Sequence, residues 1–163
     1  TYVNEGDKEL KSFSVRHDQQ FRIPLIKQAI RTAGGSLTLF ASPWSPPAFM
    51  KSNNSMLKGG KLLPEFFQSW AIYFTKFIKA YEAEGIPIHA VTIQNEPSVD
   101  RAKEKNSKWH YPSCRWTAEQ ERNFIRDHLG PADSQVVTDK RERMAFVRIL
   151  GDRHRYFREV EHV

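Results

Sequence analysis

The residues best suited to catalysis lie at the end of the stretch IHAVTIQNEP, residues 88–97. The apolar run predicts a short strand, and Pro97 cannot extend it because its ring removes the backbone donor. Asn95 and Glu96 therefore stand at the strand tip. An apolar wall beside a carboxyl favours the protonated form that a general acid needs, and the Asn95 amide suits a substrate hydroxyl. We interpret Glu96 as a candidate general acid/base. The alternative is a glutamate that only caps the strand or forms a salt bridge.

A second group of candidate residues surrounds the loop ASPWSPPAFM, residues 41–50. Its three prolines stiffen the loop, and Trp44 follows a predicted strand over residues 37–41. We expect the indole of Trp44 to lie at the same rim as Glu96, where a flat ring offers a stacking surface for a sugar. The loop after Glu96 holds rings that would extend this surface, although each is equally compatible with local packing: Trp109, Tyr111 and Trp116.

The elements that must position these residues alternate between helices and strands. The segment after Asp18, which we expect to be a helix cap, has an apolar stripe and ends at Gly34-Gly35. That stripe consists of Phe21, Leu25, Ile26, Ala29 and Ile30. The run over residues 37–41 is short and apolar, which predicts a strand buried on both faces.

The clearest predicted helix covers residues 64–84, because large side chains recur there at spacings of three and four. They are Phe67, Trp70, Ala71, Phe74, Phe77, Ile78 and Tyr81. Pro64 suits the helix start and Gly85 its end. A further helix should begin at Thr117, where Thr-Ala-Glu-Gln fits a capping box, and stop at Gly130-Pro131. Residues 134–139 and 140–150 suggest another strand and helix.

Strands that alternate with amphipathic helices predict parallel βαβ units. The turns from helix to strand are tight, whereas the segments from strand to helix, residues 42–63 and 98–116, are long. Long loops at the carboxyl ends of parallel strands are where α/β proteins build their sites. The tip that carries Glu96 lies on that side.

Composition and charge narrow the range of protein classes to which this sequence fits. The chain has 163 residues and a net charge of +6, with one cysteine, which excludes an internal disulfide. No apolar run approaches the roughly 20 residues of a membrane helix. The basic residues of 140–158 alternate with acids, which favours a solvated helix face over a nucleic-acid site. The spacing of His110 and Cys114 suits two metal ligands, but no second pair accompanies them, and we predict no metal.

Several ordered blocks carry a resemblance to a known family. They are TLFASPWSPPAFMK, GGKLLPEFFQSWAIYFTKFIKAYEAEGIPIHAVTIQNEP and SCRWTAEQERNFIRDHLGP, with the upstream piece YVNEGDKELKSFSVRHDQQFRIPLIKQA. Together they resemble glycoside hydrolase family 30, the glucosylceramidase and endo-1,6-β-glucanase family. The likeness covers residues 1–132 and decays over 133–163. It implies an α/β fold, a (β/α)8 TIM barrel beside a β-sandwich, that hydrolyses β-glycosides with retention and without a cofactor.

The resemblance also assigns roles to individual positions. It implies that Glu96, at the end of the fourth barrel strand, is the general acid/base. Asn95 would bind the sugar near its 2-hydroxyl and Trp44 would line the sugar pocket. Asp139 would match a pocket carboxylate after the fifth strand, and Trp109 remains a candidate for substrate contact. The family's nucleophile, a Glu at the end of the seventh strand, has no counterpart in this chain.

We therefore expect a partial barrel, roughly strands three to five with their helices, as a fragment of one catalytic domain over residues 1–163. A barrel of this type needs about 250 residues, so this chain would not close one. The expected substrate is a β-glucoside such as glucosylceramide, or a β-1,6-glucan, and the isolated chain should have no turnover. The alternative from another class is a non-catalytic carbohydrate-binding remnant. Members of the family are often secreted or lysosomal, and the sequence does not assign a compartment.

Overall fold

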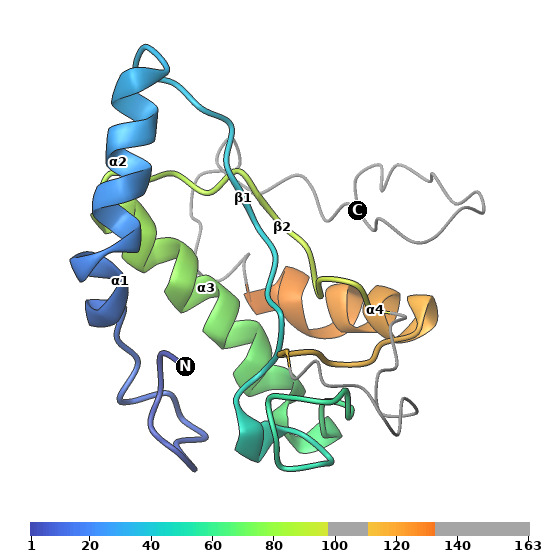
Figure 1. Ribbon diagram of the computed structural model, residues 1–163. Helices are drawn as coiled ribbons and strands as arrows, with labels where there is room; N and C mark the ends of the chain where they lie inside the picture. The colour runs from blue at the N-terminus through green and yellow to red at the C-terminus, as the bar shows by residue number, and fades with distance from the viewer. Residues whose placement is uncertain (98–110, 133–163) are drawn as a thin grey trace.

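A two-stranded parallel sheet lies at the centre of the computed structural model, which describes residues 1–97 and 111–132. Strand β1 (Phe40–Ala41) pairs with strand β2 (Ala90–Val91) in the register Phe40↔Ala90 and Ala41↔Val91 (Figure 1). Backbone hydrogen bonds continue the pairing beyond the strands. His89 N donates to Leu39 O at 2.9 Å, and Thr92 N donates to Ala41 O at 3.0 Å. The predicted parallel βαβ unit is confirmed, although both strands are shorter than predicted.

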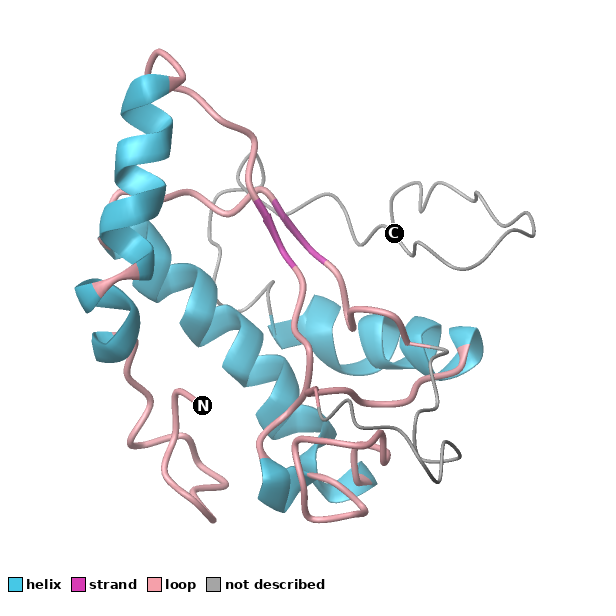
Figure 2. Ribbon diagram, in the orientation of Figure 1, coloured by secondary structure: helices cyan, strands magenta, loops and turns pink. Residues whose placement is uncertain are grey.

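The helix α3 (Phe67–Ala83) connects the two strands, and a 3₁₀ turn, η2 (Pro64–Phe66), leads into it. Figure 2 shows the two strands running side by side. The predicted start at Pro64 and end at Gly85 are confirmed. Gly85 has a φ of 75°, and the next amide, Ile86 N, donates to Tyr81 O at 2.9 Å, which closes the last turn.

The apolar face of α3 forms the core, as its spacing predicts. Its buried residues are Trp70, Ala71, Tyr73, Phe74, Thr75, Ile78 and Tyr81. On one side this face packs against α4 (Ala118–Phe124), which continues into a π-helical turn, η4 (Ile125–Leu129). Phe124 lies 6.4 Å from Phe74, measured between ring centroids. These aromatic contacts fix α4 beside α3.

The start of α4 was predicted correctly, and its end was not. Thr117 and Gln120 form the predicted capping box, with Gln120 N donating to Thr117 Oγ1 at 3.2 Å and Thr117 N to Gln120 Oε1 at 2.9 Å. Helical turns continue to Ala132 instead of stopping at Gly130-Pro131. Proline is tolerated where its missing N–H is not required, so Pro131 alone did not fix the end.

Two further expectations concern the segment before β1, and both are corrected. Helix α1 (Arg16–Gln20) contains Asp18, which therefore does not cap a helix, and α2 (Arg22–Thr32) follows directly. The predicted stripe of α2 faces largely outward, since Phe21 is 70% and Leu25 66% exposed, while Ile23 is the buried residue. Periodicity identifies an apolar face, but it does not provide an element to cover that face.

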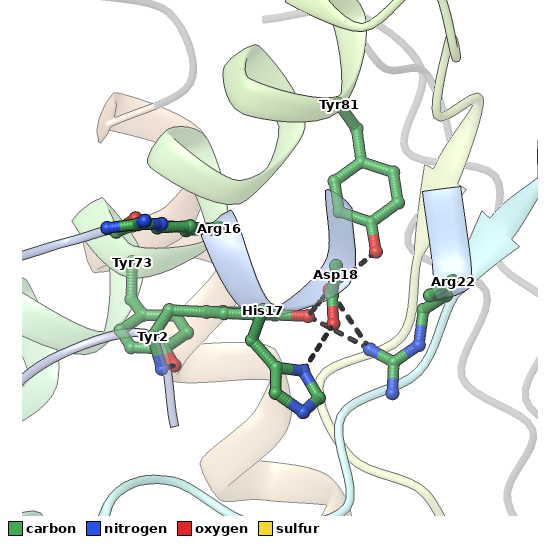
Figure 3. Close-up of polar contacts among 8 residues, drawn as sticks. Tyr2, Arg16, His17, Asp18, Arg22, Tyr73 and Tyr81 are labelled. Carbon is green, nitrogen blue, oxygen red and sulfur yellow. Dashed lines mark hydrogen bonds and ion pairs between the residues drawn. The ribbon is translucent and has the colours of Figure 1, made fainter. Parts of the chain in front are cut away.

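Asp18 is buried at the centre of a polar cluster that ties the N-terminal segment to α3 (Figure 3). Its carboxylate accepts hydrogen bonds from the Tyr2 hydroxyl and, at 2.7 Å, from the Tyr81 hydroxyl. Arg22 contacts it at 3.2 Å and His17 at 3.3 Å. Burial acts to raise the pKa of Asp18, but the hydrogen bonds from Tyr2, Tyr81 and His17 prevail and hold that pKa below its usual value.

Strand β1 is also less buried than predicted. Val91 is 3% exposed and faces the core, whereas Phe40, one position earlier in the register, is 66% exposed. Successive side chains of a strand point to opposite faces, so Phe40 marks the open face of this sheet. The described residues cover only the other face, which explains the difference.

Among the residues that the structure describes, no helix has the length and hydropathy to cross a membrane.

Candidate functional site

The ends of β1 and β2 bring Glu96 and Trp44 to one rim. The strands are parallel, so the residues that follow them leave the sheet at the same edge. Asn95 N donates to Pro43 O at 2.8 Å, which places the backbone before Glu96 directly against the backbone before Trp44. The hydroxyls of Ser42 and Thr92 make a second connection, 2.5 Å apart. Two chain segments that are far apart in sequence are thus joined at the predicted site.

Glu96 has an unusual backbone conformation. Its φ is 49°, in the left-handed region that residues other than glycine rarely adopt. Pro97 follows it, and a residue before proline normally prefers an extended conformation. Hydrogen bonds hold both neighbours, because Asn95 N donates to Pro43 O and Trp116 N donates to Pro97 O at 2.9 Å. Backbone strain that is held in this way is frequent at functional sites.

The surroundings of the Glu96 side chain differ from the sequence expectation. Ile93 is buried beneath the tip, as expected for the apolar strand, but Glu96 itself is exposed. The apolar wall predicted beside the carboxyl is therefore not built by the described residues. The side chain is open to solvent and accessible to a ligand.

The aromatic surface predicted at this rim is formed by only some of its candidates. Trp44 is 50% exposed, and Tyr111 packs edge-on against it, with ring centroids 5.8 Å apart and planes at 83°. Trp116 is 5% exposed and stacks on Phe67 at 6.2 Å, so it belongs to the core and not to a sugar platform. Trp109 lies outside the described residues, as does Asp139.

The long loops after the two strands are joined to each other by polar contacts at Ser113. Ser113 N donates to Met56 O at 3.0 Å, and its hydroxyl accepts from Gly59 N at 2.8 Å. Lys51 donates its Nζ to Ser113 O at 2.6 Å. Lys51 is only 2% exposed, and this burial lowers its pKa to about 8. The loop that carries Trp44 is thus fixed to the segment that follows Glu96.

Two residues of this region were missed by sequence reasoning. Lys51 lies in a polar loop where a lysine gives no sign of burial. Gln94 reads as the last residue of a strand, yet it is 4% exposed and donates its Nε2 to Trp44 O at 2.7 Å and to Asn95 O at 3.0 Å. The available signal was its position, a polar residue closing an apolar strand immediately before Asn95.

Within residues 1–97 and 111–132, no group of three or more His, Cys, Asp or Glu is arranged to hold a metal.

Known proteins resemble this chain in sequence and in fold. The family described as the glycosyl hydrolase family 30 TIM-barrel domain matches residues 1–157. Putative glucosylceramidase 4 of Caenorhabditis elegans is 42% identical over 131 residues, which are 77% of this chain and 24% of that protein. The structure of SrfJ from Salmonella typhimurium superposes with a TM-score of 0.72 at 34% identity, over 83% of this chain and 28% of the other. The endo-β1,6-glucanase BT3312 gives a TM-score of 0.66 at 30% identity, over 78% and 28%.

The chain belongs to glycosyl hydrolase family 30, and its parallel unit is part of a TIM barrel. It spans about a quarter of the length of the curated relative described above. Among the described residues the sheet has two strands and is open, which agrees with this coverage, since a closed barrel requires eight strands.

Proposed function

We propose that this chain contributes the acid/base side of a retaining β-glucosidase site, with Glu96 as the general acid/base. The observation that carries the proposal is the rim itself. The carboxyl of Glu96 follows β2, the indole of Trp44 follows β1, and the hydrogen bond from Asn95 N to Pro43 O joins the two segments at 2.8 Å. The rim thus combines a candidate proton donor with a candidate stacking surface for a sugar ring.

The chemistry follows the two-carboxyl mechanism of retaining glycosidases. Protonated Glu96 donates its proton to the glycosidic oxygen while a second carboxylate attacks the anomeric carbon, and the alcohol leaves. Glu96, now ionised, removes a proton from water as that water displaces the enzyme carboxylate. The two carboxyl groups must lie roughly 5–5.5 Å apart. The family resemblance supplies no second carboxylate within this chain, so we expect the isolated chain to have no turnover.

The remaining substrate contacts are part of the same proposal. Asn95 would donate its amide to the sugar 2-hydroxyl, and Trp44 would stack on the sugar ring, with Tyr111 supporting its edge. Asp139 and Trp109 are proposed as further contacts. The substrate would be a β-glucoside of the glucosylceramide type, and the endo-β-1,6-glucanase among the similar structures supports a β-1,6-glucan as the second candidate.

The test uses a chimera in which the matched segment of the Caenorhabditis elegans relative is replaced by residues 1–132 of this chain. Hydrolysis of an aryl β-glucoside by this chimera should fall by at least about 100-fold in Glu96→Gln, because general acid catalysis contributes about 10²–10⁴-fold. Glu82→Gln, an equivalent change at an exposed position of α3, is the control and should leave hydrolysis unchanged. Equal rates in the two variants of an active chimera would contradict the assignment of Glu96.

A non-catalytic carbohydrate-binding protein is the second candidate, and the half-exposed indole of Trp44 is the observation that favours it. Binding of a β-1,6-glucan to the 163-residue chain distinguishes the two functions. If binding is lost in Trp44→Ala and unaffected in Glu96→Ala, and the chimera is active without Glu96, the binding function is supported instead of the catalytic one.

A further inference from the structure

Gln94 is buried in a place where packing alone does not account for an amide. It is 4% exposed and follows Ile93, which is 2% exposed, in the apolar strand segment. Its Oε1 has no hydrogen-bond partner among the residues that the structure describes. An unsatisfied buried acceptor is unfavourable, so an apolar side chain of similar size would suit a purely structural role better. The reason for the amide must therefore be found in its donor group.

Both donor contacts of Gln94 reach the rim that carries the proposed acid/base. Nε2 donates to Trp44 O at 2.7 Å and to Asn95 O at 3.0 Å. These two carbonyls belong to different strand ends. Trp44 is 50 positions from Gln94 in the sequence, and Asn95 is the next residue. A single side chain thus holds both segments of the site.

The orientation of the Asn95 carbonyl determines the orientation of the peptide plane that precedes Glu96. The Asn95 carbonyl and the Glu96 nitrogen belong to one peptide plane, and this plane is rigid because of its partial double bond. When Gln94 fixes the carbonyl, the plane from which the Glu96 side chain departs is fixed as well. Glu96 sits there with a φ of 49°, a conformation that persists only when its surroundings hold it.

We infer that Gln94 is a positioning residue, which clamps the carbonyls of Trp44 and Asn95 together and so fixes the Glu96 carboxyl relative to the indole. The contribution of this clamp to catalysis rests on the proposed function, whereas the clamp itself does not. Gln94 touches no reacting atom, and its effect on a reaction would pass through the backbone of Asn95 and Trp44.

Amide hydrogen exchange, measured by NMR on the full 163-residue chain, tests the clamp. In Gln94→Met, which keeps the shape and removes the donor, the protection of the Asn95 amide should fall by about tenfold, the effect of one to two lost hydrogen bonds. Amides in the core of α3 should keep their protection. Gln19→Met is the matched control, because it removes another glutamine donor, the 2.7 Å contact to Glu84, and should leave the Asn95 amide unchanged.

Gln94→Glu provides a second variant should Gln94→Met fail to fold. A protonated carboxylic acid can donate to one of the two carbonyls, whereas a carboxylate can donate to neither and repels both. The protection factor of the Asn95 amide should therefore be near wild type at low pH and fall as the pH rises. Unchanged protection of Asn95 in both variants would overturn the inference, and so would an equal loss at Asn95 and throughout α3.

The glucosidase chimera separates this inference from the proposed function. Gln94→Met should lower its kcat by about tenfold with a smaller change in KM, since the acid/base would be misplaced by a small distance. If Glu96→Gln leaves the chimera fully active while Gln94→Met loosens Asn95, the proposed function fails and the clamp stands. If both Gln94 variants leave Asn95 protected, the clamp fails and the role of Glu96 is unaffected.

Discussion

Glu121 provides the most quantitative test of the described packing. It lies on α4, it is 4% exposed, and no hydrogen bond or ion pair to its carboxyl is found among the described residues. Burial raises the pKa of Glu121 from 4.5 to about 7. A shift of this size corresponds to about 3 kcal/mol of differential stability between the two protonation states.

The sign of the pH dependence follows from this shift. Below pH 4.5 the carboxyl is protonated in the folded and the unfolded chain, and its ionisation costs nothing. As the pH rises from 4.5 to 7, the unfolded chain releases the proton while the folded chain retains it, so stability is lost. Above pH 7 the loss is complete. A glutamine side chain cannot ionise, so Glu121→Gln should have little effect at pH 4 and should raise the free energy of unfolding by about 3 kcal/mol at pH 8.

Urea unfolding of both proteins across pH 4–8 measures this difference, and subtracting the two curves removes the contribution of all other groups. Glu119→Gln on the same helix is the control. Its side chain is 75% exposed and 3.5 Å from Arg122, so the change should stay within about 1 kcal/mol at every pH. A difference curve for Glu121→Gln that is flat, or that shows destabilisation at pH 8, would refute the burial of the Glu121 carboxyl on α4.

Three further outcomes follow from other described residues. Asp18→Asn should lower the free energy of unfolding in urea by about 2–3 kcal/mol at pH 7, because hydrogen bonds stabilise the Asp18 carboxylate and depress its pKa. This loss should shrink as the pH falls below about 4, and a loss that does not depend on pH would argue against a buried carboxylate. Glu96→Gly should raise the free energy of unfolding by about 1 kcal/mol, because glycine adopts the left-handed conformation freely, and a loss in the same assay would contradict the strain. Phe40→Thr should reduce light scattering of concentrated solutions while changing stability by less than about 1 kcal/mol, since the ring lies on an open sheet face; a large loss of stability would show that the face is covered.

The sequence was sufficient where a feature depends on regular spacing. The apolar repeat of residues 67–81 predicted the core face of α3, and the two strand runs with an intervening helix predicted a parallel pair. The shared rim of Trp44 and Glu96 followed from that topology, because the ends of parallel strands meet at one edge. These features depend on local periodicity and on general rules of connection.

Features that depend on contacts across the chain could not be predicted in this way. Asp18 has the local pattern of a helix cap, but its partners Tyr2 and Tyr81 approach from distant segments and draw it into the interior. Trp116 and Trp44 are the same residue type, so the sequence does not distinguish them, and the stacking of Trp116 on Phe67 shows that Trp116 belongs to the core. Gln94 belongs to the same group, since its contact with Trp44 O arises only after the two strands pair.

The most direct test of the proposed role of Glu96 is the stereochemistry of azide rescue in the chimera. Glu96→Ala removes the base that activates water in the second step. Azide needs no base, and it can attack the anomeric carbon of the glycosyl-enzyme from the face that water uses. With an aryl β-glucoside that has a good leaving group, we expect azide to restore turnover and the product to be the β-glucosyl azide. An α-glucosyl azide, or the absence of rescue in a folded chimera, would contradict the assignment of Glu96 as the general acid/base.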